Sequence, residues 1–226
     1  MANFEQAFGR FVQSIGGEIV PRCAQESADY IFRAEKVVAE LKTLEEDSLP
    51  SHVQKLSALF ENWQRRGLIR VFGTATIDIQ TVPQELQREW LDLIEPPIEG
   101  IIRKANGQIR STKEVHQLSA AKGLLLIVND GNFLHTVPVN FMISVGRILQ
   151  KKDELGQSRF PHIRGVVYFS YRIPAAGDPA LFWLPGTMEP AADADLSTFQ
   201  DRLQREWFAY FASLVRRPVT TSPRVA

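Results

Sequence analysis

A β-hairpin predicted over residues 28–43 constrains this chain more than any other segment. Two runs rich in Val, Ile, Tyr and Phe, at 28–33 and 36–43, flank a short polar stretch suited to a turn. With the turn centred on that stretch, Asp29 lies directly opposite Glu40, with the two Cβ atoms roughly 5 Å apart. The hairpin therefore places two acids on one face.

The same strand adds a cation to these acids. Strand side chains alternate between faces, so Glu40 and Lys42 share the face that Asp29 occupies. The residues between and before them point into a core on the other face: Val37, Ala39 and Leu41. Carboxylates this close repel each other, and a divalent cation bound between them would relieve the repulsion.

Asp29, followed after ten residues by Glu40-Leu41-Lys42, resembles the signature of the PD-(D/E)XK nuclease superfamily, which has the restriction-endonuclease-like fold. The resemblance implies metal-dependent hydrolysis of nucleic-acid phosphodiesters. It also implies that Asp29 and Glu40 bind the ion, that the main-chain carbonyl of Leu41 adds a ligand, and that Lys42 positions or activates the attacking water. Ala28 stands where the family usually has proline.

The triplet Glu40-Leu41-Lys42 has a simpler structural explanation. Acid-any-Lys triplets occur by chance in a chain of this composition, so the weight of the motif comes from its hairpin context. Without a metal, the same residues would form a cross-strand pair on a solvated sheet face, with Lys42 neutralising one acid.

The segments before and after the hairpin predict alternating helices and strands. In residues 3–15 the Phe and Val residues recur at helical spacing, which predicts a helix with an apolar stripe. Glu5 on this helix resembles a supporting glutamate of the family. The alternative is that Glu5 only interacts with the helix dipole, which favours acids in the first turn. We expect further elements as follows: strand 18–20, helix 51–66 capped by Ser51, strand 70–81, and helix 84–94 ending before Pro96-Pro97.

A basic helix is predicted over residues 98–121. It carries four cations: Arg103, Lys104, Arg110 and Lys113. These cations would either contact the phosphate backbone of a nucleic acid, which would make nucleic-acid binding dependent on salt, or form only a solvated helix face. Gln108 shares a face with Lys104 and resembles the polar residue that family members carry on the helix after the catalytic hairpin.

The rest of the chain continues the α/β pattern. Gly123–Val128 predicts a strand buried on both faces, and the polar residues 129–132 predict a turn, which explains Asp130 better than metal binding does. The later elements are expected at these positions: helix 139–149, strand 164–171, strand 181–184, helix 196–215 and a loose tail at 218–226.

Composition excludes several classes of protein. The net charge is zero, so attraction to nucleic acid must come from a local patch. A single cysteine, Cys23, excludes an internal disulfide and a cysteine zinc site, and the four histidines lack ligand spacing. Signal-peptide features, long apolar runs and nucleotide-binding or hydrolase motifs are absent, so we expect a cytoplasmic protein without membrane contact.

We therefore predict a single α/β domain with a mixed central sheet flanked by helices. A restriction-endonuclease-like core spans about 1–47 and 98–130, with a helical insertion at about 48–97 and an extension at about 137–217. The predicted function is a Mg²⁺-dependent nuclease, acting on DNA as a possible homodimer, in which Mn²⁺ substitutes. The alternatives are a non-catalytic scaffold of this fold that binds a partner or nucleic acid, and an unrelated α/β enzyme.

Overall fold

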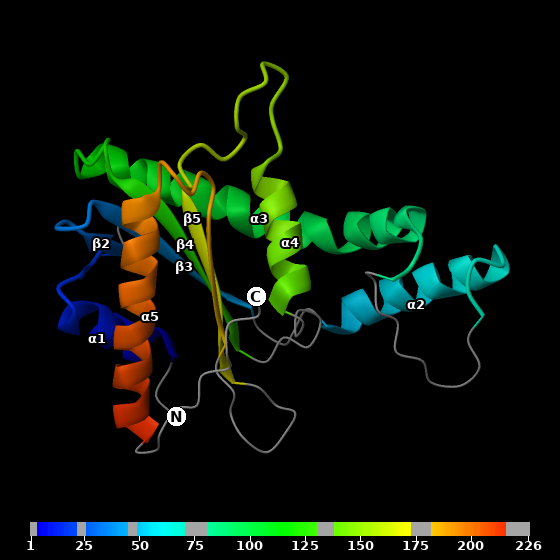
Figure 1. Cartoon of the computed structure of the whole chain (residues 1–226), viewed down its shortest axis with the longest axis horizontal. Coiled ribbons are helices and arrows are strands. Elements are labelled where there is room, and N and C mark those ends of the chain that lie inside the picture. The colour runs from blue at the N-terminus through cyan, green and yellow to red at the C-terminus, as the bar shows by residue number, and fades with distance from the viewer. Residues whose placement is uncertain are drawn as a thin grey trace.

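The computed structural model describes residues 4–21, 26–44, 49–70, 81–130, 138–172 and 182–215, with backbone only for 49–52, 171–172 and 215. This part of the chain contains five helices and six strands (Figure 1). The helices are α1 Phe4–Ser14, α2 Leu49–Arg65, α3 Gln84–Val115, α4 Pro138–Leu149 and α5 Ala194–Val215. The strands are β1 Glu18–Ile19, β2 Tyr30–Phe32, β3 Val37–Leu44, β4 Lys122–Asp130, β5 Gly165–Arg172 and β6 Trp183–Thr187.

The strands form one mixed sheet in the order β1-β2-β3-β4-β5-β6. β1, β2 and β3 pair antiparallel, β3, β4 and β5 pair parallel, and β6 pairs antiparallel with β5. The helix α3 makes the crossover from β3 to β4, and α4 makes the one from β4 to β5. The predicted α/β class with a mixed central sheet is confirmed.

Helices cover both faces of the sheet (Figure 1). α1 and α5 pack on one face, where the aromatic stripe of α1 meets Trp207 of α5, with Phe8 and Trp207 ring centroids 5.0 Å apart. α3 and α4 pack on the other face, against alternate residues of the same strands. β4 is buried on both sides, as its continuous apolar run predicts.

The hairpin has the predicted register. Tyr30 pairs with Ala39 and Phe32 with Val37, so Asp29, the residue before β2, continues this pairing toward Glu40. Val37, Ala39 and Leu41 lie in the core on the α1 and α5 face. Glu40 and Lys42 consequently project from the opposite face, which α3 covers.

The predicted break at Pro96-Pro97 is wrong, because α3 runs without interruption from Gln84 to Val115 with both prolines inside it. A proline within a helix removes a hydrogen bond and costs about 3 kcal/mol. Tertiary contacts offset this cost, since Glu95 pairs with Arg147 of α4 and with Lys151, which lies just after α4, and the apolar stripe of α3 continues beyond the prolines.

Three smaller boundaries also differ from the sequence prediction. α2 begins at Leu49, so Ser51 lies inside the helix and not at the N-cap position predicted for it. β4 extends through Asp130, so the predicted turn does not begin at Asn129. β6 begins at Trp183 and contains Pro185, which an edge strand tolerates because one side of its backbone needs no partner strand.

Two predictions lie largely or wholly outside the described residues: the strand at 70–81 and the loose tail at 218–226. The helices predicted at 3–15, 51–66, 139–149 and 196–215 and the strands at 18–20 and 164–171 are present within two residues of their expected bounds. The helix predicted over 98–121 ends earlier, at Val115. No described helix combines the length and the apolar character needed to cross a membrane.

Within residues 49–97, the structure describes α2 and the first part of α3, which lie beside each other and extend away from the sheet (Figure 1). Trp63 Nε1 donates to Glu89 at 2.7 Å, and the Phe60 and Trp90 rings stack with centroids 6.0 Å apart. Arg66 pairs with Glu89 at 2.6 Å and also contacts Glu85. This pair of helices is thus held together by its own contacts.

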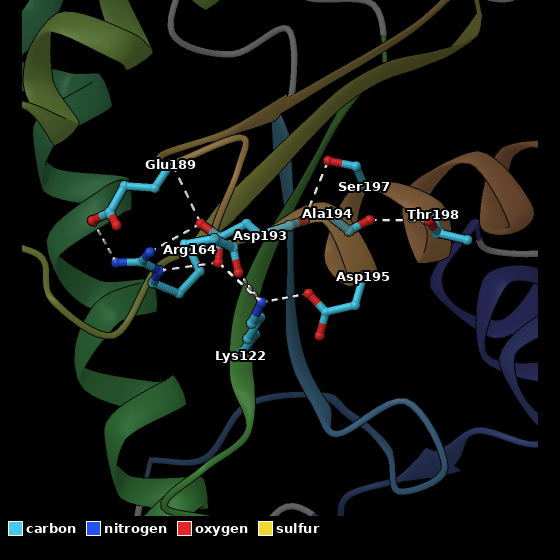
Figure 2. Close-up of polar contacts among 9 residues, drawn as sticks. Lys122, Arg164, Glu189, Asp193, Ala194, Asp195, Ser197 and Thr198 are labelled. Atoms are coloured by element: carbon cyan, nitrogen blue, oxygen red, sulfur yellow. Dashed lines mark hydrogen bonds and ion pairs between the residues drawn. The ribbon is translucent and has the colours of Figure 1, made fainter.

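A buried carboxylate fixes the start of α5 at the amino ends of β4 and β5 (Figure 2). Asp193, 1% exposed, immediately precedes α5 and lies 3.2 Å from Lys122 of β4 and 3.0 Å from Arg164, the residue before β5. Its main-chain carbonyl accepts the Ser197 N–H at 2.9 Å. One residue therefore joins two parallel strands, through its side chain, to the start of a helix, through its main chain.

We expect Asp193→Ala to lower the free energy of unfolding by about 2 to 3 kcal/mol, because it leaves two cations without their shared partner, although both retain some access to water. Asp195→Ala is the matched control, since Asp195 contacts the same Lys122 but is exposed, and should cost about 0.5 kcal/mol. Urea denaturation measures both, and equal losses would contradict the assignment.

Candidate active site

An open cleft lies at the β1 end of the sheet, between α1 and α3. It encloses about 740 Å³, and its walls come from α1, β1, the segment before β2, β3 and α3. Its polar lining includes all three residues of the predicted catalytic set together with both predicted supporting residues: Asp29, Glu40, Lys42, Glu5 and Gln108. The fold thus gathers side chains from separate segments into one open space.

Asp29 is anchored by both its backbone and its side chain. Its carbonyl accepts the N–H of Val20, the residue after β1, at 2.8 Å. Its carboxylate Oδ2 accepts the Leu41 N–H at 2.9 Å. Because N–H and C=O of one strand residue point to the same side, the Leu41 carbonyl also points toward the strand edge where Asp29 lies.

Glu40 lines the cleft but is buried, and one of its side-chain oxygens is held close to Lys42. It is 1% exposed, and its Oε1 lies 2.5 Å from Lys42 Nζ. Its Oε2 is buried and has no hydrogen-bond partner among the described residues. The pKa of Glu40 is raised to about 8, first by burial and then by the neighbouring Asp29 carboxylate, and Lys42 offsets only part of this rise.

Gln108 of α3 connects Lys42 to the segment before Asp29. Its Oε1 accepts from Lys42 Nζ at 2.7 Å, and its Nε2 donates to the Ser27 carbonyl at 3.1 Å. Lys42 therefore uses two of its three donors on Glu40 and Gln108. The third is used by no described residue.

Thr112, one helical turn beyond Gln108, is a site residue that the sequence reasoning missed. Its Oγ1 accepts the Ala28 N–H at 2.7 Å. Thr112 and Ala28 are each 1% exposed. The only sequence signal is the i,i+4 spacing from Gln108, which places the two side chains on one helix face.

The four predicted cations of α3 do not form a single surface. Only Lys104 lines the cleft, where it lies 3.6 Å from Glu26. Arg110 pairs with Glu114 at 3.9 Å, and Arg103 lies near Glu99 on another side of the helix. Lys113 is 9% exposed and donates to the His162 carbonyl at 3.4 Å, so it is not positioned to contact a phosphate backbone.

The residues of the cleft fit a hard divalent cation. Within the described part of the chain no group of three His, Cys, Asp or Glu side chains gathers in metal-binding geometry. The site instead offers two carboxylates and a main-chain carbonyl, and Mg²⁺ typically takes one or two protein carboxylates and keeps several waters. The buried Oε2 of Glu40 is an acceptor that such a cation would satisfy.

No protein-family model, curated protein or solved structure matches this chain. What the fold and the cleft define is a class: a mixed α/β protein with two adjacent carboxylates and a lysine at one end of its sheet.

Proposed function

We propose that this protein is a metal-dependent nuclease of the PD-(D/E)XK type that hydrolyses phosphodiester bonds in DNA. The observation that carries the proposal is the Glu40 carboxylate, which is buried beside Asp29 with one oxygen that no described residue satisfies. Folding alone does not favour two acids in this position. Binding of a cation gives the arrangement a chemical reason.

Asp29, Glu40 and the Leu41 carbonyl would hold Mg²⁺, and Mn²⁺ would substitute because both ions accept oxygen ligands. The ion would lower the pKa of a bound water and offset charge on the phosphate. Lys42 would use its remaining donor to orient the attacking water or a phosphate oxygen, while Glu40 and Gln108 hold its ammonium in place.

The order of elements supports a restriction-endonuclease-like core. A helix precedes an antiparallel hairpin, and the last strand of the hairpin pairs parallel with β4 after the crossover helix α3. The carboxylates lie on the hairpin and the polar supporting residues lie on α1 and α3, as the signature implies. Lys104, four residues from Gln108, lines the same cleft and would meet a phosphate of the substrate at its rim.

Calorimetric titration with Mn²⁺ and a cleavage assay with Mg²⁺ test the proposal. We expect wild-type protein to bind Mn²⁺ and to cut DNA, and Asp29→Asn to weaken Mn²⁺ binding more than about tenfold, because it removes one of two charged ligands. Glu26→Gln is the control, since Glu26 lines the same cleft but its carboxylate is 70% exposed at the rim.

The substrates in the assay should include single-stranded, double-stranded and branched DNA together with RNA, each with Mg²⁺ and with a chelator. Wild-type protein that binds no divalent ion would overturn the proposal. Protein that binds Mn²⁺ through Asp29 but cuts none of these substrates would instead identify a non-catalytic scaffold. Analytical ultracentrifugation with and without DNA would establish whether a homodimer forms.

A further inference from the structure

Two side chains of α3 hold the backbone that precedes Asp29. Gln108 Nε2 donates to the Ser27 carbonyl at 3.1 Å, and Thr112 Oγ1 accepts the Ala28 N–H at 2.7 Å. The partners are 81 and 84 residues apart in the sequence. Because Gln108 and Thr112 are four residues apart, they lie on one face of the helix, and they engage the carbonyl and the N–H of the same peptide group, the one that joins Ser27 to Ala28.

The bond to Thr112 is enclosed, and this makes its hydroxyl difficult to replace. Thr112 and Ala28 are each 1% exposed, so water does not readily reach the Ala28 N–H if the hydroxyl is removed. A buried N–H without an acceptor is unfavourable, and the chain would move to satisfy it. The residue that would move with it is the next one, Asp29.

The position of Asp29 depends on few other contacts. Its carbonyl accepts from Val20, the residue that follows the two-residue strand β1, and its carboxylate accepts from Leu41. The regular pairing of β2 with β3 begins only at Tyr30. Thr112 thus fixes the backbone on the side of Asp29 that the sheet does not hold.

We propose that Thr112 is a positioning residue that sets the geometry of the metal ligand Asp29 through the Ala28 N–H. This inference rests on the proposed function, because it assigns Asp29 to the metal. It differs from a packing role for Thr112, since a packing role needs only the shape of the side chain and the proposal needs its oxygen.

The test compares three variants of the full chain. Thr112→Val keeps the shape and removes the acceptor, Thr112→Ser keeps the hydroxyl, and Ser111→Ala removes a neighbouring hydroxyl that has no hydrogen-bond partner among the described residues. Calorimetry with Mn²⁺ alone gives the metal affinity. Amide hydrogen exchange at Ala28 in metal-free protein reports directly on the proposed bond.

We expect Thr112→Val to weaken Mn²⁺ affinity about 10- to 100-fold, the usual effect of losing a residue that orients a ligand, and to speed exchange at Ala28. The Mn²⁺ affinity of Thr112→Ser should stay within about threefold of wild type, and that of Ser111→Ala should equal wild type. If Thr112→Val does not fold, Thr112→Ala removes the same acceptor without adding an apolar methyl group in its place.

Unchanged Mn²⁺ affinity in folded Thr112→Val protein would overturn the positioning role. Equal losses in Thr112→Val and Thr112→Ser would overturn it too, because shape rather than the oxygen would then be responsible. These outcomes are distinct from failure of the proposed function, in which wild-type protein itself does not bind Mn²⁺ through Asp29.

Discussion

Metal-free protein carrying Glu40→Gln is expected to be more stable at pH 9 than metal-free wild type, by about 2 kcal/mol or more. The Glu40 carboxyl is buried beside Asp29, and its pKa is raised to about 8 from an ordinary value of 4.5. At pH 9 the native wild-type protein must therefore keep a carboxylate charged where burial and Asp29 both oppose it. Glutamine has nearly the same shape and carries no charge.

The dependence on pH follows from the direction of the shift. The folded protein binds the Glu40 proton more tightly than the unfolded chain does. The contribution of Glu40 to the free energy of unfolding is therefore greatest below pH 4.5 and falls as pH rises through 8. The full difference between the two pKa values corresponds to at most about 5 kcal/mol. The expected gain is smaller because the glutamine amide also needs hydrogen bonds.

Urea denaturation in the presence of a chelator, between pH 5 and 9, measures the effect. The gain from Glu40→Gln should grow with pH, and saturating Mn²⁺ should reverse it by stabilising only wild type. Glu95→Gln is the control, and it should lower stability, because Glu95 is 5% exposed and contacts two cations, Arg147 and Lys151. A Glu40→Gln protein less stable than wild type at pH 9 would show that Lys42 dominates the environment of Glu40.

Local patterns in the sequence predicted the hairpin and its register. The alternation of apolar residues in β3 determines which side chains enter the core, and a shift by one residue would bury Glu40 and Lys42 among the aromatic rings of α1. The short turn then fixes which residues face each other. Asp29, Glu40 and Lys42 were therefore predictable as a group, since all three lie within one supersecondary unit.

Contacts between distant segments were not predictable in this way. The bonds from α3 to Ser27 and Ala28 join residues more than 80 positions apart, and no local pattern specifies the rotation of α3 above the sheet. The rotation also decides that Lys104 lines the cleft while Lys113 lies buried beside His162. A row of cations in the sequence therefore did not become a row on the surface.

The error at Pro96-Pro97 has a related cause. Proline is a reliable helix boundary when only local energies act, because each proline removes one backbone hydrogen bond. Here α3 has 32 residues and packs on α4 next to the prolines, where Glu95 meets Arg147 and Lys151. Burial and ion pairing on both sides of the prolines hold the helix in one piece.

Removing the Lys42 ammonium is expected to lower the rate of DNA cleavage about 10²- to 10³-fold, the usual effect of losing one donor that stabilises developing charge. Lys42→Met keeps the length and apolar stem of the side chain and removes the charge. Mn²⁺ affinity should be unchanged or tighter, because the ammonium lies 2.5 Å from Glu40 Oε1 and competes with a cation for that carboxylate.

Single-turnover cleavage at saturating Mg²⁺, with Mn²⁺ calorimetry on the same protein, separates the two effects. Lys104→Met is the matched control, since Lys104 lines the same cleft but its side chain is 56% exposed and contacts only the rim residue Glu26 among the described acids. It should weaken DNA binding and reduce its salt dependence while leaving the single-turnover rate within about threefold. If Lys42→Met instead loses Mn²⁺ binding and cleavage together, Lys42 acts by holding Glu40 in place, and the ammonium has no separate part in the chemical step.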